Sequence, residues 1–87
     1  MYKLIIEKDV SKFLLKHKWE KLISIFKEKF ILLSENPYRD DLDIKAIIWK
    51  NNQYRLRIWK YRFLYEINED IITISVFNAD SRWLIYK

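Results

Sequence analysis

The most regular pattern in the chain runs from Gln53 to Glu66, where apolar and polar residues alternate with the period of two expected of half-buried β-strands. We interpret this stretch as a β-hairpin. If Trp59 and Lys60 form its turn, the apolar side chains share one face and should belong to the core: Tyr54, Leu56, Ile58, Tyr61, Phe63 and Tyr65. Trp-Lys lacks the glycine or asparagine that two-residue turns favour. A four-residue loop from Ile58 to Tyr61 is the alternative, and it leaves the same residues on each face.

The opposite face of this hairpin carries arginines. In the predicted register Arg57 lies directly across from Arg62, and Arg55 lies further along the same face. Like charges in a cross-strand pair repel and destabilise a sheet. The face is therefore either a solvated surface on which long side chains splay apart, or an anion-binding site.

The N-terminal half predicts one strand and two helices. Residues 2–6 form a short β-branched run, and Asp9 can cap a short helix that reaches Lys16. Apolar residues then recur at steps of three and four along residues 19–33, which is the spacing of an amphipathic helix. Asn36-Pro37 ends that helix, because the residue before a proline is disfavoured in the helical conformation.

The C-terminal half predicts further strands around the hairpin. Strands are expected at residues 44–49 and 71–77, turns at 50–52, 68–70 and 78–81, and a last extended segment at 82–86. The element order is β-α-α-β-β-β(-β). It predicts an α+β fold, in which two N-terminal helices pack on one face of an antiparallel or mixed twisted sheet of four to five strands. The other face would be available for a ligand.

The composition excludes several kinds of functional site. At 87 residues, the chain is long enough to fold as one domain, residues 1–87, without disulfides. It has no cysteine and no glycine, which excludes thiolate chemistry and a phosphate-binding glycine loop, and fits a reducing cytoplasm. No apolar run suggests a signal peptide or approaches the ~20 residues of a membrane span. The acids Asp40, Asp41 and Asp43 are expected to be solvated, and neither a metal nor a cofactor is predicted.

The positive charge is concentrated on the central strands. The net charge is +5, and residues 44–65 contain six basic residues and no acid. Interleaved with Tyr and Trp, such a stretch is typical of a surface that binds a phosphate backbone and stacks on bases, or that receives an acidic protein segment.

No triad of nucleophile, base and acid is available for catalysis. His17, the only histidine, lies between the two predicted helices and is expected at the surface. Acid–base chemistry must therefore come from Tyr, Lys or a carboxylate. The four arginines that could together clamp a phosphate are Arg55, Arg57, Arg62 and Arg82. If residues 82–86 are extended, Tyr86 lies on the same face as Arg82.

These motifs resemble the RelE/ParE superfamily of bacterial toxins. The resemblance rests on residues 54–58, on residues 61–67, on Arg82 followed four residues later by Tyr86, and on Asn36-Pro37, and it covers essentially the whole chain. It implies a RelE-like fold. Two departures are the turn without glycine and Ser81, where many members have a histidine.

The resemblance also implies a function. RelE-type members are ribosome-dependent endoribonucleases that cut messenger RNA in the A site, leaving a 2′,3′-cyclic phosphate. By this likeness Arg62 and Arg82 are the catalytic phosphate-binding arginines, and Tyr86 is the terminal aromatic that stacks on or deprotonates the substrate. The residues expected to bind RNA or phosphate are Arg55, Arg57, Lys50 and Lys60.

The implied partners follow from the same likeness. They are messenger RNA on the ribosome, with contacts to 16S ribosomal RNA, and a cognate acidic antitoxin through which the complex would bind operator DNA. Two alternatives remain open: a ParE-like inhibitor of DNA gyrase, and a catalytically silent member that only binds its antitoxin. Retention of the basic and aromatic set favours the ribonuclease.

Overall fold

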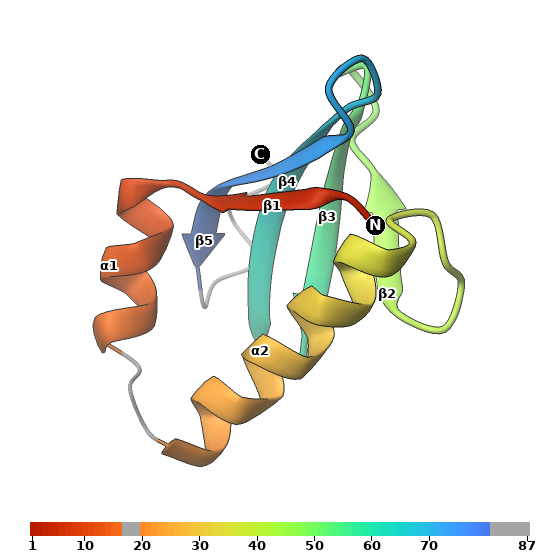
Figure 1. The fold of residues 1–87 in the computed structure, drawn as a ribbon. Coiled ribbons are helices and arrows are strands. Elements are labelled where there is room, and N and C mark those ends of the chain that lie inside the picture. The colour runs from red at the N-terminus through yellow and green to blue at the C-terminus, as the bar shows by residue number, and fades with distance from the viewer. Residues whose placement is uncertain (17–19, 81–87) are drawn as a thin grey trace.

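The computed structural model describes residues 1–16 and 20–80. It contains two helices and five strands (Figure 1). In chain order these are β1 (Lys3–Ile6), α1 (Lys8–Lys16), α2 (Glu20–Glu35), β2 (Asp43–Ala46), β3 (Gln53–Ile58), β4 (Tyr61–Asn68) and β5 (Thr73–Asp80). In this described part, neither helix is long and apolar enough to cross a membrane.

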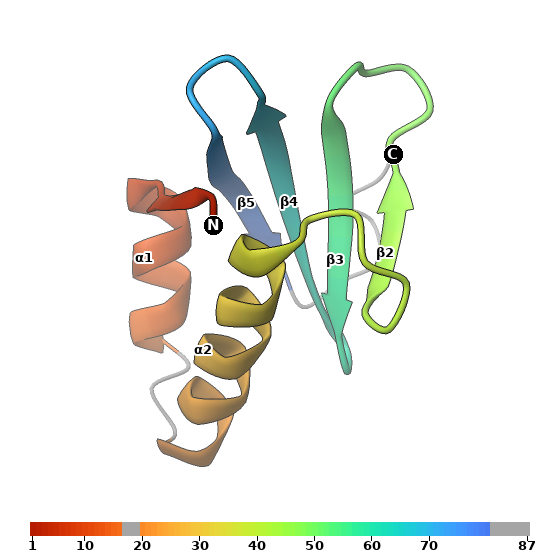
Figure 2. The same ribbon diagram turned by 45° about the vertical axis from the view of Figure 1, so that its right-hand side comes forward.

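The strands form one mixed sheet in the order β1-β5-β4-β3-β2. Strand β1 pairs parallel to β5, and every other neighbouring pair is antiparallel. Because β1 and β2 lie at opposite edges, the two helices between them in sequence carry the chain across the sheet (Figures 1 and 2). The predicted α+β class and mixed sheet are confirmed.

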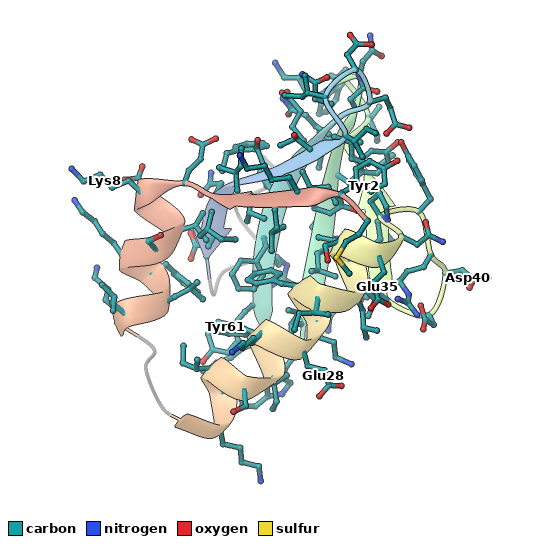
Figure 3. All side chains as sticks on the ribbon, viewed as in Figure 1. Tyr2, Lys8, Glu28, Glu35, Asp40 and Tyr61 are labelled. Atoms are coloured by element: carbon teal, nitrogen blue, oxygen red, sulfur yellow. The ribbon has the colours of Figure 1, made fainter. Side chains whose placement is uncertain are left out.

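Both helices pack on the same face of this sheet. The apolar row of α2 is buried as its spacing predicts, with Phe26 1% and Leu33 0% exposed. Its aromatic rings meet those of the hairpin edge to face: the Phe26 and Phe63 centroids are 5.1 Å apart at 77°. Figure 3 shows Tyr61 beside α2, and its ring centroid lies 5.3 Å from that of Phe26. The core is therefore an aromatic layer between α2 and the hairpin.

The hairpin has the two-residue turn. Ile58 pairs with Tyr61, and the register continues to Gln53 opposite Glu66. The predicted core face is confirmed, since five of its six members are buried and Tyr54 is partly buried. The chain has no glycine, and among its described residues three in turns adopt positive φ: Asn52 (64°), Trp59 (59°) and Ile72 (49°).

The boundaries of two predicted strands are wrong. Strand β2 ends at Ala46, because the amide of Ile47 makes the last bond to β3, at 2.9 Å from the Gln53 carbonyl, before the chain turns. Ile48 and Trp49 consequently lie in the turn, 85% and 81% exposed. Strand β5 begins later and extends further than expected.

The predicted turn at residues 78–81 is strand as far as Asp80. A register shift at Leu64/Tyr65 allows β5 to continue beside β4 to the pair Arg62 and Asp80, despite the poor strand propensity of Asn78 and Asp80. Helix α1 begins at Lys8, so Asp9 lies in its first turn instead of capping it. The predictions for His17, Trp19, Ser81 and residues 82–86 fall outside the described residues.

Candidate functional site

Four charged residues form a row across the face of the sheet away from the helices, which we call the charged row. Arg57 and Arg62 are directly paired between β3 and β4. Asp43 on β2 pairs with Arg57, and Asp80 on β5 pairs with Arg62. The sequence predicted the like-charged pair at the centre. It missed the carboxylate on each outer side, which offsets the repulsion between the arginines.

The hairpin turn orients both central arginines. The Arg57 Nε donates a hydrogen bond to the Trp59 carbonyl at 2.9 Å, and the Arg62 Nη1 donates to the Lys60 carbonyl at 3.1 Å. The two guanidinium groups are thereby drawn to the same end of the sheet. The Arg57 side chain is 48% exposed and Arg62 is partly exposed, so the pair faces solvent at the hairpin end.

Arg55 lies on the predicted face but is buried. Its side chain is only 7% exposed, and its Nη2 donates to Asp43 Oδ1 at 2.7 Å. The other oxygen of Asp43 lies 3.9 Å from Arg57 Nε. Asp43 therefore pairs with two arginines, where the sequence predicted a solvated acid. A phosphate that is to reach Arg55 has to displace this carboxylate.

The two predicted lysines lie at opposite ends of β3. Lys60 in the hairpin turn is exposed, and its Nζ lies 5.4 Å from the centroid of the Trp59 ring. Lys50 is exposed in the loop before β3, roughly 20 Å away along a six-residue strand. The Lys60 carbonyl thus contacts Arg62, whereas its ammonium lies 5.6 Å from the ring centroid of Tyr61, a side chain of the helix-covered face. In the described part of the chain, neither lysine side chain is shown in contact with Arg57 or Arg62. Arg82 and Tyr86, the other predicted site residues, lie outside the described residues.

In the loop after α2, Asp41 is paired with an arginine. Asp41 accepts a hydrogen bond from Arg39 Nη2 at 2.9 Å, and this pairing lowers the pKa of the Asp41 carboxyl. In residues 1–16 and 20–80 no three potential metal-ligating side chains of His, Cys, Asp or Glu come together.

A second polar cluster ties the ends of the fold together. Glu69 accepts hydrogen bonds from the Tyr2 hydroxyl at 2.6 Å and from the Tyr38 hydroxyl at 3.1 Å. The bond to Glu69 raises the pKa of Tyr2 to about 12. Below this cluster the buried Tyr65 hydroxyl donates to the Pro37 carbonyl at 3.1 Å, and burial raises the pKa of Tyr65. These contacts join the residue before β1, the loop after α2 and the β4–β5 turn, so the cluster stabilises the fold.

Comparison with solved structures places this fold among RelE-like toxins. The archaeal RelE of a RelE–RelB complex from Pyrococcus horikoshii OT3 superimposes with a TM-score of 0.81 at 25% identity, covering 94% of this chain and 96% of that one. The RelB–RelE complex from Methanococcus jannaschii gives a TM-score of 0.72 at 29% identity, with 95% of each chain covered. The isolated E. coli RelE toxin shares the fold alone, at 15% identity, a TM-score of 0.75 and coverage of 94% and 85%.

The family model described as the ParE toxin of the type II toxin–antitoxin system parDE matches residues 4–83. The chain therefore belongs to this family, and it is a toxin of the RelE/ParE superfamily, as the sequence motifs predicted. No curated protein matches it significantly.

Proposed function

We propose that this toxin is a RelE-like messenger RNA interferase, which cleaves translated messages in the ribosomal A site and so inhibits translation. The 2′-hydroxyl of a ribose attacks the adjacent phosphorus and loses its proton to a general base. The bond from phosphorus to the 5′-oxygen breaks, and that oxygen takes up a proton. The products are a 2′,3′-cyclic phosphate and a 5′-hydroxyl.

The observation that carries this proposal is the paired Arg57 and Arg62. A fold gains nothing from two guanidinium groups directly opposite each other in a sheet. Both are held by backbone carbonyls of the turn and reach solvent, which suits them to receive a phosphate. Arginine stays protonated at neutral pH and binds phosphate oxygens bidentately, so the pair can stabilise the negative charge of the transition state.

In this proposal the outer carboxylates balance the charge of the two arginines until a phosphate binds. With Asp43 and Asp80 at its ends, the charged row has two positive and two negative members and no net charge. The contact of Arg57 with Asp43 is long, at 3.9 Å, and a phosphate can replace it at little cost. Arg55, bound more closely to Asp43, then keeps that carboxylate in place.

The remaining roles follow the family likeness. We assign phosphate binding to Arg82 together with Arg62, and proton transfer or stacking to Tyr86. Lys60 and Lys50 would contact RNA at the two ends of β3. Arginine is too weak a base to accept the proton, so the assignment of Tyr86 requires the surrounding arginines to lower the pKa of its phenol.

The partner we propose is an antitoxin. The Pyrococcus and Methanococcus relatives are complexes of RelE with RelB. By analogy, residues 1–87 would act as a single domain in the cytoplasm, neutralised by an acidic antitoxin that also binds operator DNA. The six basic residues of segment 44–65 would attract such a partner.

A second candidate function is inhibition of DNA gyrase. It is favoured by the ParE description of the matching family. The charged row argues for the ribonuclease, because a gyrase poison has no need of a phosphate-binding arginine pair.

Ribosomes programmed with a synthetic message provide the direct test. The purified toxin should cut within the A-site codon, and both Arg57→Ala and Arg62→Ala should abolish the cut while thermal unfolding shows that the variants stay folded. Lys12→Ala removes a positive charge from an exposed position on α1 and should cut normally. Undiminished cleavage by both arginine variants would overturn the site assignment.

A further inference from the structure

A hollow lies beside β2 and the β2–β3 loop, on the face of the sheet that carries the charged row. Lys45 on β2 pairs with Arg55 on β3, and both line it. Each is two positions along its strand from a member of the charged row, so their side chains point to the same face. The described residues of the lining are Lys45, Ala46, Ile47, Ile48, Trp49 and Arg55. Its volume of about 260 Å³ is below the roughly 300–1,000 Å³ typical of pockets for drug-sized ligands, so it has room for one flat ring system.

Trp49 lines this hollow without belonging to the core. It is 81% exposed and lies in the β2–β3 loop. Main-chain hydrogen bonds hold that loop. The Lys50 amide donates to the Ile47 carbonyl at 3.2 Å, across the turn that contains Trp49. The Ile67 amide on β4 donates to the Asn52 carbonyl at 2.9 Å. The indole is therefore presented to solvent by a fixed turn, and a preorganised contact residue loses little conformational freedom on binding.

The charge of the hollow favours an anion. Its described lining contains two basic side chains and no acid. The Arg55 guanidinium is engaged by Asp43, at 2.7 Å from Oδ1. The Lys45 ammonium is exposed and forms no hydrogen bond or ion pair with any described residue. An exposed aromatic ring beside an available cation is the combination with which proteins bind single-stranded nucleic acid, because the ring stacks on a base and the cation binds a phosphate.

The hollow and the arginine pair share one face and one strand. Arg55 at the hollow and Arg57 in the pair are two residues apart on β3, about 7 Å along the strand. The β2–β3 loop lies at the other end of β3 from the hairpin turn (Figure 2). A message that follows the strand away from the arginine pair therefore passes Lys45 and then reaches the indole of Trp49.

We propose that Trp49 stacks on an unpaired base of the message, near the nucleotide whose phosphate Arg57 and Arg62 bind, and that the Lys45 ammonium binds a phosphate between them. Trp49 and Lys45 are then substrate-binding residues outside the catalytic pair. This inference rests on the proposed ribonuclease function, and names a second part of the message that the toxin holds. An acidic segment of a protein partner would also be attracted to Lys45, but it has no need of a flat aromatic ring.

Two substitutions of Trp49 separate stacking from apolar contact. Trp49→Phe retains an aromatic ring, whereas Trp49→Leu retains apolar surface without one. Because the side chain is 81% exposed, both variants should keep the melting temperature of the parent. Leu15→Ala is the matched control, since Leu15 is 68% exposed on α1, which packs on the opposite face of the sheet.

The measurement is the toxin concentration that gives half-maximal single-turnover cleavage on programmed ribosomes. One message is unmodified, and a matched set carries an abasic ribonucleotide at one position at a time, across the A-site codon and the nucleotides on either side. Loss of one stacked base should raise that concentration about tenfold. Trp49→Leu should show this loss on the unmodified message. Trp49→Phe should recover most of the affinity, and Leu15→Ala should cleave as the parent does.

The abasic messages decide whether the indole touches a base of the message. One abasic position should weaken the parent toxin about as much as Trp49→Leu does, and should have no further effect on that variant. Losses that add in full at every abasic position would overturn the inference, because the indole would then contact a protein or the ribosome instead. Equal cleavage of the unmodified message by Trp49→Leu and the parent would overturn it as well.

Lys45→Ala tests the phosphate contact separately. It should weaken cleavage equally on every message, and should reduce by about one the slope of the logarithm of the half-maximal concentration against the logarithm of the salt concentration. An unchanged slope would contradict the phosphate contact. If the parent toxin leaves every message intact, the proposed function fails and the inference fails with it. Cleavage that depends on Arg62 but not on Trp49 refutes the stacking alone.

Discussion

Asp43→Asn tests the electrostatic arrangement of the charged row. The substitution preserves the shape of the side chain and removes its charge. It leaves the Arg55 guanidinium, whose side chain is 7% exposed, without the carboxylate that now lies 2.7 Å away. The more distant contact with Arg57, at 3.9 Å, is lost as well.

The expected loss of folding stability follows from the burial of Asp43 and Arg55. Removing one partner of a fully buried pair costs about 3–5 kcal/mol, which is an upper bound here. The Asp43 side chain is 49% exposed, so water screens the pair, and an asparagine oxygen can still accept a hydrogen bond from Arg55. The exposed contact with Arg57 adds at most about 1 kcal/mol. We expect a total loss of about 2 kcal/mol, or a melting temperature lower by about 8–16 °C.

Urea unfolding measures this loss directly. Asp40→Asn is the matched control, since Asp40 is an exposed acid of the preceding loop, and its free energy of unfolding should stay within about 0.5 kcal/mol of the parent's. An Asp43→Asn protein as stable as this control would refute the claim that the carboxylate holds the buried Arg55.

The other predictions concern alkaline stability, the core and the antitoxin. Because the pKa of Tyr2 is raised to about 12, the folded state holds a proton that the unfolded chain loses near pH 10, so stability should fall between pH 10 and 12. Tyr2→Phe should reduce that fall, and identical pH profiles of unfolding would contradict it. Phe63→Ala, at a fully buried position between two helices and the sheet, should cost about 3–5 kcal/mol in chemical unfolding; a loss below about 1 kcal/mol would contradict the packing described. Association with the antitoxin, followed by stopped flow, should slow as salt is raised, since surface charges are screened within about 8 Å at physiological salt. An association rate independent of salt would show that the basic strands do not steer the partner.

The parts of the fold that the sequence predicted depend on local periodicity. The alternation through residues 53–66 determines which side chains of the hairpin share a face, and either turn length gives the same answer. The Arg57 and Arg62 pair could therefore be derived from the sequence alone. Helix α2 was predictable for a similar reason, since its apolar spacing and Pro37 define its buried face and its end.

The missed features depend on pairing between distant segments. Asp43 and Asp80 join the charged row only because β2 starts at Asp43 and β5 continues past a register shift to Asp80. Neither boundary has a sequence signal, and Asp is a poor strand former. The burial of Arg55 depends on the same pairing, since its carboxylate comes from a strand twelve residues away. The parallel pairing of β1 with β5 joins the two ends of the described fold, which no local pattern reveals.

The proposed function requires that the toxin cleave messages through the arginine pair of its sheet. Primer extension on abundant messages after induction of the toxin in cells tests it most directly, with Arg62→Ala induced in parallel. Cells that make the parent toxin should show cuts within translated codons, and cells that make the variant should show none. Intact messages together with trapped gyrase–DNA complexes would contradict the proposed function.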